Sequence, residues 1–212
     1  MAQLVKSWLT LDKNGGSGDS TVTASASENN TGRNARTINV TFTAANCPNV
    51  VRTITQAGKP EFVEFNSATA SVAKAGGSVT ITGRSNSSKL TFSLGSGGDL
   101  NITLPASYTA AGVSVNNGAT IPGDPDPGAT SDFAFSITIS NISENTTVDA
   151  LTKQLIVTDN ASNTATCNIS QAAGDASLSV SPTSGVTLAW NSYSEGTSAS
   201  FTVTSNTNWT VS

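Results

Sequence analysis

The feature that most constrains the fold of this chain is a strand-and-turn segment that occurs twice. ITQAGK at 54–59 and ISQAAG at 169–174 each end an apolar, β-branched run with a glutamine and a turn of small residues. The two glutamines, Gln56 and Gln171, lie 115 positions apart. Similarity at a long, fixed spacing is typical of repeated domains. The sequence therefore predicts more than one β-domain, each closing with a strand that ends in Gln.

Apolar residues alternate with polar ones over most of the 212 residues. In RTINVTFTAA (36–45), Ile38, Val40 and Phe42 take every second position, and SDFAFSITISNI (131–142) follows the same rule. Charged residues make up only 11% of the chain, against about 25% in ordinary globular domains. Such a composition also suits disorder, but the period of two indicates sheets with a Thr-rich exposed face. We predict an all-β fold of antiparallel sandwiches in tandem.

The alternation and the turn residues between runs place the expected strands. Asn117-Gly118 predicts a type I′ hairpin between 113–116 and 119–121, whereas the prolines of PGDPDPG (122–128) exclude a central strand there. No run has a helical period. The expected strands are 8–11, 21–29, 36–45, 50–56, 67–74, 78–83, 90–94, 101–104, 113–121, 131–142, 153–159, 164–171, 186–190 and 198–205.

Composition and motifs argue against several classes of function. Without histidine a Ser-His-Asp triad cannot form, no Asp/Glu pair stands apart from turn positions, and GSGG at 95–98 does not open a helix. We expect no catalytic residue, no cofactor and no enzyme activity. The net charge of −4 argues against nucleic acid, and no apolar run is long enough for membrane insertion. The first residues lack a signal peptide, so we expect synthesis in a cytoplasm without export by a Sec signal.

Two small groups of residues are candidates for disulfide or metal chemistry. Cys47 and Cys167 lie at different distances from their glutamines, so a disulfide would have to join different domains. We expect two free cysteines that behave as small hydrophobic residues. Asp124, Asp126 and Asp132 are candidate Ca²⁺ ligands in a Pro/Gly loop, but their spacing matches no EF-hand. We expect a solvated turn there, and no metal site.

The ends and the middle of the chain resemble one family. DASLSVSPTSGVTLAW followed by SASFTVTSNTNWTVS (175–212) resembles the first half of a BACON domain, an Ig-like β-sandwich module found in Bacteroidetes and their phages. SWLTLDKNGGSGD through VVRTITQAGK (8–59) resembles the second half of that domain, and residues 62–174 carry both halves. The resemblance implies a partial domain at 1–59, a complete sandwich at 60–174 with an insertion near 97–140, and a first half at 175–212.

This order of half-domains has two explanations. Either the gene product continues past Ser212, or residues 175–212 of one subunit pair with residues 8–59 of a neighbour and cover its strand edges. The second explanation predicts a homo-oligomer.

The aromatic residues are candidates for sugar contacts. Trp8, Trp190 and Trp209 lie in expected strands, and the resemblance places Trp8 and Trp209 in sandwich cores. Tyr108 and Tyr193 lie in expected loops and are the candidate glycan-contact residues.

The resemblance and the exclusions lead to three hypotheses on function. The first is a structural virion protein of a crAss-like tailed bacteriophage, a head-fibre, capsid-decoration or tail-associated subunit. Its partners would be other virion proteins of the capsid or tail, further copies of itself, and host or mucus glycans. The alternative is a carbohydrate-binding BACON module of a secreted or surface Bacteroidetes glycoside hydrolase. The third is a segment of a bacterial adhesin.

Overall fold

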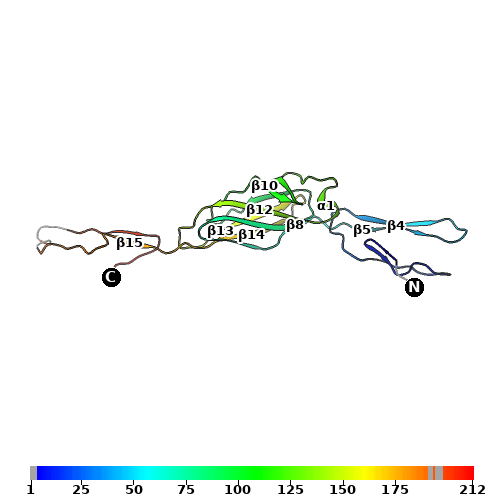
Figure 1. Ribbon diagram of the computed structural model, residues 1–212, viewed down its shortest axis with the longest axis horizontal. Coiled ribbons are helices and arrows are strands. Elements are labelled where there is room, and N and C mark those ends of the chain that lie inside the picture. Colours follow the sequence, from blue (N-terminus) through cyan, green and yellow to red (C-terminus); the bar gives the residue numbers. More distant parts are fainter. Residues whose placement is uncertain (1–3, 191–192, 194–197) are drawn as a thin grey trace.

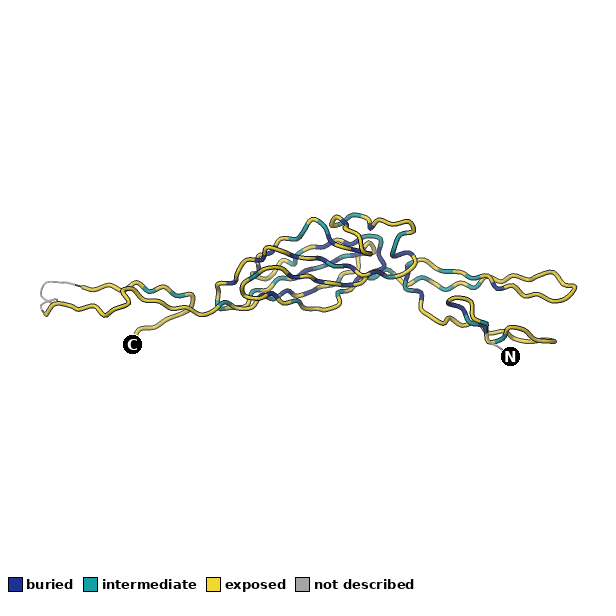
Figure 2. The backbone as a smooth tube through the Cα atoms, in the orientation of Figure 1, coloured by how far each residue is buried: buried dark blue, intermediate teal, exposed yellow. Residues whose placement is uncertain are grey.

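The computed structural model describes residues 4–190, 193 and 198–212, and these are built almost entirely from β-strands. The predicted all-β fold is confirmed. The molecule is elongated, with a central sandwich and one arm at each end (Figure 1). We call residues 4–59 the N-arm, residues 60–174 the central sandwich, and the described residues of 175–212 the C-arm. Buried residues are concentrated in the central sandwich, while most of each arm is exposed (Figure 2).

The central sandwich has two facing sheets. One has five strands in the order β11-β10-β12-β8-β6, and the other has four in the order β7-β14-β13-β9. All pairings are antiparallel except that of β14 with β7. The strands are β6 (Val63–Phe65), β7 (Thr69–Val72), β8 (Gly77–Ser85), β9 (Leu90–Leu94), β10 (Ser107–Ala110), β11 (Val113–Asn116), β12 (Phe133–Ile142), β13 (Leu151–Asp159) and β14 (Thr164–Gln171).

Alternation explains why these strands pack as they do. In β12 the side chains of Phe133, Phe135, Ile137 and Ile139 are buried on one face, as the sequence predicts. Ile137 lies opposite Ile81 of β8 in the same sheet. Because successive side chains of a strand point to opposite faces, this register brings the apolar residues of both strands to the inner face. The core between the sheets follows directly from the pattern.

The hairpin predicted at Asn117-Gly118 is wrong. The turn that joins β10 to β11 contains Ala111 and Gly112, which both have positive φ (49° and 81°), as a type I′ turn requires. At the predicted site only Gly118 has positive φ, and the Asn117 side chain bonds the backbone nitrogen and oxygen of Phe92. Asn-Gly therefore makes a β-turn that anchors the chain to β9 instead of reversing it into a hairpin.

The expected insertion, 97–140, contributes to the core of the sandwich. It contains β10, β11, the short helix α1 (Pro127–Thr130) and most of β12. The expected strand 101–104 does not form, although Leu100 and Ile102 are buried. Helix α1 begins after Asp126, whose side chain accepts a hydrogen bond from the Gly128 nitrogen. The segment extends the five-stranded sheet at one edge.

The N-arm has two small sheets that cover each other. One contains β1 (Leu4–Lys6), β2 (Leu9–Leu11) and β3 (Ala24–Ala26) in that order, and the other is the hairpin of β4 (Arg36–Phe42) and β5 (Val50–Gln56). The buried residues between them are Trp8, Leu9, Leu11 and Val40. This core is far smaller than that of the central sandwich.

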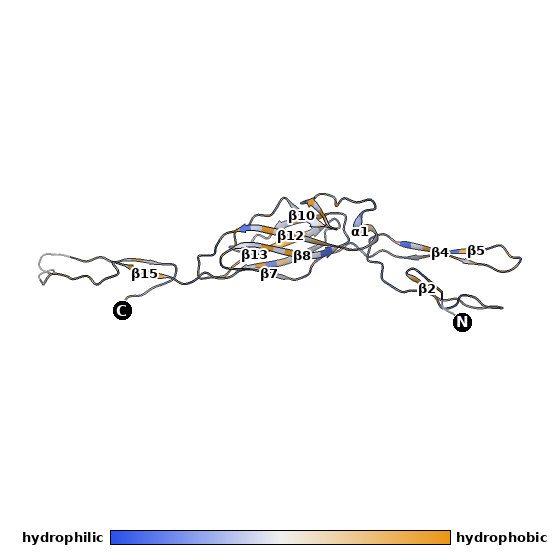
Figure 3. Ribbon diagram, in the orientation of Figure 1, coloured by the Kyte–Doolittle hydropathy of each residue, from blue (hydrophilic) through white to orange (hydrophobic). Residues whose placement is uncertain are grey.

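The C-arm is a single antiparallel hairpin in the part of the chain that the structure describes. It pairs β15 (Leu178–Ser181) with β16 (Thr202–Ser205). The expected strand at 186–190 does not form, and the expected strand at 198–205 is shorter than predicted. Apolar residues lie along the strands of both arms (Figure 3). No helix among the described residues is long and apolar enough to cross a membrane.

Candidate functional site

The N-arm hairpin repeats the hairpin of the central sandwich in the same register. Arg36 of β4 lies opposite Gln56 of β5, and Leu151 of β13 lies opposite Gln171 of β14. Every pair of β4–β5 has its counterpart 115 positions later in β13–β14. The spacing between the two glutamines is therefore a structural repeat, and it allows each residue of the N-arm hairpin to be compared with one in a complete sandwich.

A buried asparagine extends the repeat beyond the strands. Asn30 Nδ2 donates hydrogen bonds to the carbonyls of Asn34 (2.8 Å) and Ala57 (3.1 Å). Its counterpart Asn145 donates two equivalent hydrogen bonds, at 2.8 and 3.0 Å. The acceptor carbonyls of these bonds belong to the residues 115 positions after Asn34 and Ala57. Both side chains are buried. The sequence motifs did not indicate these two asparagines, although the 115-residue spacing between them identifies the pair.

A second asparagine repeat relates the C-arm to the first half of the central sandwich. Asn86 Oδ1 accepts a hydrogen bond from the Phe62 nitrogen (3.0 Å), and Asn206 Oδ1 accepts one from the Ser177 nitrogen (2.8 Å). Phe62 and Ser177 are again 115 positions apart. Ser205 precedes Asn206 and lies opposite Leu178, as Ser85 lies opposite Val63 in the central sandwich. The strands β15 and β16 therefore correspond to β6 and β8.

The arms hold complementary parts of the sandwich. In the central sandwich, β8 covers the edge of β12, β7 covers the edge of β14 and β9 covers the edge of β13. The N-arm has the counterparts of β12, β13 and β14, which are β3, β4 and β5, and each keeps the corresponding edge open among the described residues. The C-arm has the counterparts of β6 and β8, and its described residues supply no second sheet. Each arm lacks what the other contains.

Apolar side chains that are buried in the central sandwich have exposed counterparts in the arms. Phe42 is 43% exposed, whereas its counterpart Val157 is 0% exposed. Phe201 of the C-arm is 55% exposed, whereas Ile81 at the corresponding position of β8 is 4% exposed. Large exposed apolar patches on soluble proteins mark interaction sites. The two arms therefore carry the candidate interaction surfaces of the molecule.

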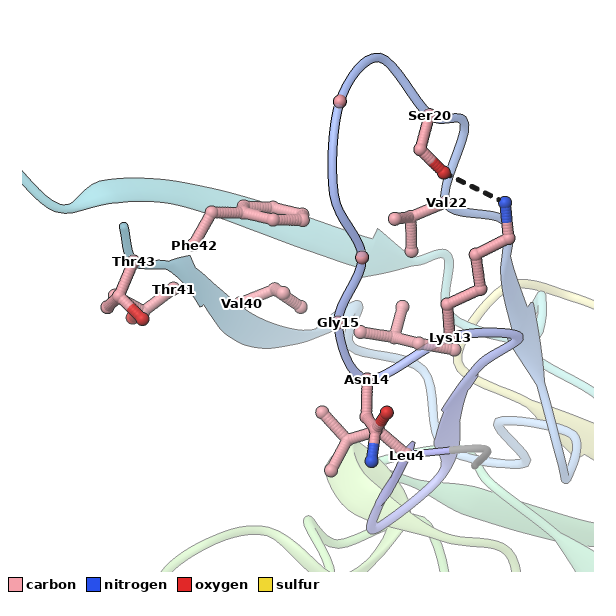
Figure 4. Close-up of a pocket in the computed structure, with 13 residues that line it drawn as sticks. Leu4, Lys13, Asn14, Gly15, Ser20, Val22, Val40, Thr41, Phe42 and Thr43 are labelled. Carbon is pink, nitrogen blue, oxygen red and sulfur yellow. Dashed lines mark hydrogen bonds between the residues drawn. The ribbon is translucent and has the colours of Figure 1, made fainter. Parts of the chain in front are cut away.

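The N-arm surface contains an open pocket of about 280 Å³. Figure 4 shows Val22, Val40 and Phe42 facing this space, with the Lys13 ammonium bonded to the Ser20 hydroxyl at 3.0 Å on its rim. Val22, Val40 and Phe42 correspond to Ile137, Leu155 and Val157, which are buried in the central core. The pocket thus occupies the position that β8 and β9 fill in the complete sandwich. Its lining residues are Leu4, Leu11, Lys13, Asn14, Gly15, Gly16, Gly18, Ser20, Val22, Val40, Thr41, Phe42 and Thr43.

The two candidate glycan-contact tyrosines lie in different environments. The prediction that Tyr108 lies in a loop is wrong, because it belongs to β10 and is buried against the ring of Phe92, with 4.9 Å between ring centroids. Burial raises the pKa of the Tyr108 phenol, partly offset by the nearby backbone of Leu90, and the hydroxyl makes no hydrogen bond of normal geometry. It cannot contact a glycan in this fold. Tyr193 is fully exposed, so its role in glycan contact stays a prediction.

The three tryptophans also separate into two groups. Trp8 is buried in the N-arm core, with the Arg36 guanidinium 5.0 Å from its ring centroid. Trp209 is half exposed, so the expectation that it lies in a core is wrong for the C-arm as it stands in this chain. Trp190 is almost fully exposed. The core that would bury Trp209 needs strands that the described C-arm does not contain.

The candidate metal and disulfide residues have structural roles. Asp126 pairs with Arg33 of the N-arm at 2.7 Å, and Asp132 pairs with Arg84 at 2.6 Å. The described residues contain no group of three side chains placed to hold a metal ion. Asp126 therefore links the N-arm to α1.

Neither cysteine is in a disulfide. Cys47 is exposed on the loop between β4 and β5. Cys167 is buried in β14, and this burial raises the pKa of its thiol. Cys167 packs as a small apolar residue in the core, as the sequence predicts.

Comparison with known proteins finds a family match in the N-arm. Residues 5–57 match the family model described as "BACON: Putative binding domain, N-terminal". No curated protein matches the chain. The matched segment covers both sheets of the N-arm and ends one residue after Gln56. The match supports a BACON-like domain in the N-arm, and the family description names a binding module.

Proposed function

We propose that this chain is a structural, non-catalytic subunit of a tailed-bacteriophage virion of the crAss-like kind, working as a head-fibre, capsid-decoration or tail-associated protein. The observation that carries the proposal is the arrangement of repeated Ig-like units in an elongated chain whose two arms present open strand edges. Open edges and exposed apolar residues suit assembly with other chains, since both gain hydrogen bonds and buried area when covered. The resemblance to phage-borne BACON domains supports the virion as the location.

The direct test is to find the particle that contains the chain. Virus-sized particles are purified on a density gradient from the community in which the sequence occurs, and their proteins are identified by mass spectrometry. The proposal expects peptides of this chain to sediment with capsid and tail proteins. Recovery only from cell-envelope or secreted fractions, together with polysaccharide-degrading enzymes, would contradict it and favour the alternative role.

The alternative function is a carbohydrate-binding module of a secreted or surface glycoside hydrolase. Two exposed aromatic residues of the C-arm, Trp190 and Tyr193, favour it, because aromatic faces stack on sugar rings. Glycan adhesion is also compatible with a virion protein, where many linked copies raise avidity without a new contact at each site. Both functions would therefore use the exposed aromatic surface of the C-arm. They differ in whether that surface belongs to a virion or to a secreted or surface enzyme.

A glycan array tests the adhesive part of both functions. The full chain is compared with Tyr193→Ala and with Tyr108→Phe, which changes the buried tyrosine and leaves the surface intact. Adhesion through the C-arm predicts that Tyr193→Ala weakens the bound signal and that Tyr108→Phe does not. An unbound wild-type chain, or equal binding by all three, would remove Tyr193 as a contact residue.

A further inference from the structure

We propose that the C-arm of one copy completes the N-arm of a second copy, so that each junction between copies forms one full sandwich. This inference deepens the assembly role proposed above by naming the partner as a second copy of this chain. It is carried by the central sandwich, in which both halves are present and joined. The same chain thus displays the complex that its two arms are able to form.

The first contact follows from the register of β8 with β12. In the central sandwich Thr80 lies opposite Thr138, and their hydroxyl oxygens are 2.9 Å apart on the exposed face. The corresponding residues are Ser200, just before β16, and Thr23, just before β3. The intermolecular sheet therefore places Ser200 of one copy opposite Thr23 of the next.

The second contact follows from the register of β9 with β13. Phe92 lies opposite Val157 in the central sandwich. Aligning Leu90 with Trp209 makes Val211 the counterpart of Phe92, and Val157 corresponds to Phe42. Residues 209–212 of one copy would then run along the open edge of β4. This brings the exposed Trp209 and Val211 over the N-arm pocket, where they cover apolar side chains on both copies.

Backbone hydrogen bonds at the end of the hairpin support the same junction. In the central sandwich the nitrogen of Ala172 donates to Val72 at 3.0 Å, and the nitrogen of Asn145 donates to Lys74 at 2.7 Å. The counterparts of the two donors are Ala57 and Asn30, whose nitrogens make no such bond within the described chain.

The glutamine side chain shows the same difference. Gln171 Nε2 donates to Ser143 at 2.8 Å and to two carbonyls just after β7 at 3.2 and 3.3 Å. Gln56 Nε2 keeps only the counterpart of the first bond, to Glu28 at 3.0 Å. The missing acceptors all lie at or just after β7 in the complete sandwich. An incoming C-arm segment supplies acceptors at these positions.

The two arms of one chain do not meet, so a junction between an N-arm and a C-arm needs two copies. The N-arm and C-arm extend from opposite ends of the central sandwich (Figure 1). Within one chain the sandwich separates the two surfaces. A junction between unlike surfaces is heterologous, so it builds rings when the rotation closes and open filaments when it does not.

Disulfide trapping tests the predicted register. Thr23→Cys and Ser200→Cys are combined in a Cys47→Ser background, which removes the exposed thiol and leaves the buried Cys167. The control combines Ser200→Cys with Thr53→Cys. Thr53 is equally exposed but lies in the facing sheet, which packs about 10 Å away. Cysteines with Cα atoms more than about 7 Å apart do not bridge without backbone movement.

Under oxidising conditions the Thr23/Ser200 pair is expected to give a ladder of covalent oligomers on a non-reducing gel, and the Thr53/Ser200 pair is expected to remain monomeric. Equal cross-linking of the two pairs, or of neither, would overturn the inference. Particle association by mass spectrometry is read independently. A failed ladder with particles still containing the chain removes the copy-to-copy junction and leaves the virion role.

A charge placed in the junction gives a second test that needs no oxidation. Phe201→Asp introduces a carboxylate where an apolar side chain should become buried, and the matched control Val113→Asp changes an exposed apolar residue of β11. Light scattering is expected to show oligomers for the wild type and for Val113→Asp, and monomers for Phe201→Asp. Oligomers that survive Phe201→Asp would show that copies join through another surface.

Discussion

The hairpins β4–β5 and β13–β14 have the same register and different surroundings. In the central sandwich the hairpin is flanked by β7 and β9 and covered by a five-stranded sheet, and its inward-facing residues Leu155, Val157 and Ile169 are fully buried. In the N-arm the equivalent hairpin has two open edges among the described residues, and its apolar residues Phe42 and Val50 are nearly half exposed. Local alternation and turn length therefore determine the register of a hairpin, whereas its contribution to stability depends on the strands that cover it.

The largest difference in the stability cost of a substitution is expected at the equivalent isoleucines, Ile54 and Ile169. Ile169→Ala removes a fully buried side chain and should lower the free energy of unfolding by about 2–5 kcal/mol. Ile54→Ala changes a half-buried residue and should cost about 1 kcal/mol in the monomer. Denaturation monitored by circular dichroism measures the first. The fluorescence of Trp8 in a Trp190→Phe, Trp209→Phe background measures the second, because no tryptophan lies in the central sandwich. Equal losses of stability for the two variants would mean that other strands already cover the N-arm hairpin.

Substitutions of the equivalent glutamines, Gln56 and Gln171, should differ less in their cost to the free energy of unfolding. Gln171 is 1% exposed and donates to three carbonyls, so Gln171→Ala should cost about 1–3 kcal/mol by leaving buried acceptors unpaired. Gln56 is partly exposed, and Gln56→Ala should cost about 0.5–1.5 kcal/mol, the value of an ordinary hydrogen bond. The same two spectroscopic probes report the values. A larger loss for Gln56→Ala would contradict the difference in cover.

Substitutions of the equivalent asparagines, Asn30 and Asn145, should cost the same free energy of unfolding. The difference between the two hairpins is therefore confined to the strands and their edges. Asn30 and Asn145 are both buried and make the same bonds within their own arm or sandwich. Each substitution to Ala should cost about 1–3 kcal/mol, since each leaves two carbonyls without their donor. If Asn30→Ala proves neutral while Asn145→Ala is costly, the loop at Asn30 is not held as the structure indicates.

The smallest effect is expected at Tyr108 and depends on pH. Its hydroxyl is buried without a hydrogen-bond partner, so Tyr108→Phe should leave stability at pH 7 unchanged within about 1 kcal/mol or raise it slightly. Burial raises the pKa of the folded phenol above its ordinary value of 10.0. Above pH 10 the unfolded chain therefore releases this proton first, and ionisation favours unfolding. Urea titrations at pH 9 and pH 11 should show a smaller loss for Tyr108→Phe than for the wild type.

The sequence predicted the elements whose apolar residues alternate over long runs. Strands 50–56, 90–94 and 164–171 have the predicted bounds, because each has a buried partner on both sides or a strong turn at its ends. Asn117-Gly118 misled the prediction, since the same dipeptide fits a hairpin and a type II turn. The difference depends on the contact of the Asn117 side chain with Phe92, which lies 25 residues away in the sequence.

The candidate site was predicted in outline and not in its parts. The order of half-domains predicts complementary arms, and in the structure the strands of the two arms correspond to different strands of the central sandwich. The sequence placed Tyr108 in a loop because a short strand of SYTA has no long alternation around it. It also placed Trp209 in a core, and that core requires strands from elsewhere. The alternation of apolar and polar residues indicates which face of a strand is apolar, but not which chain covers that face.

The most direct test of the account is the mass of the chain in solution as a function of its concentration. Complementary arms predict a mass by light scattering that exceeds the 21.4 kDa of one chain and rises with concentration. The rise should vanish in Phe201→Asp and persist in Val113→Asp. A wild-type mass that stays at 21.4 kDa over the whole concentration range would contradict the joining of one copy's C-arm to the N-arm of the next.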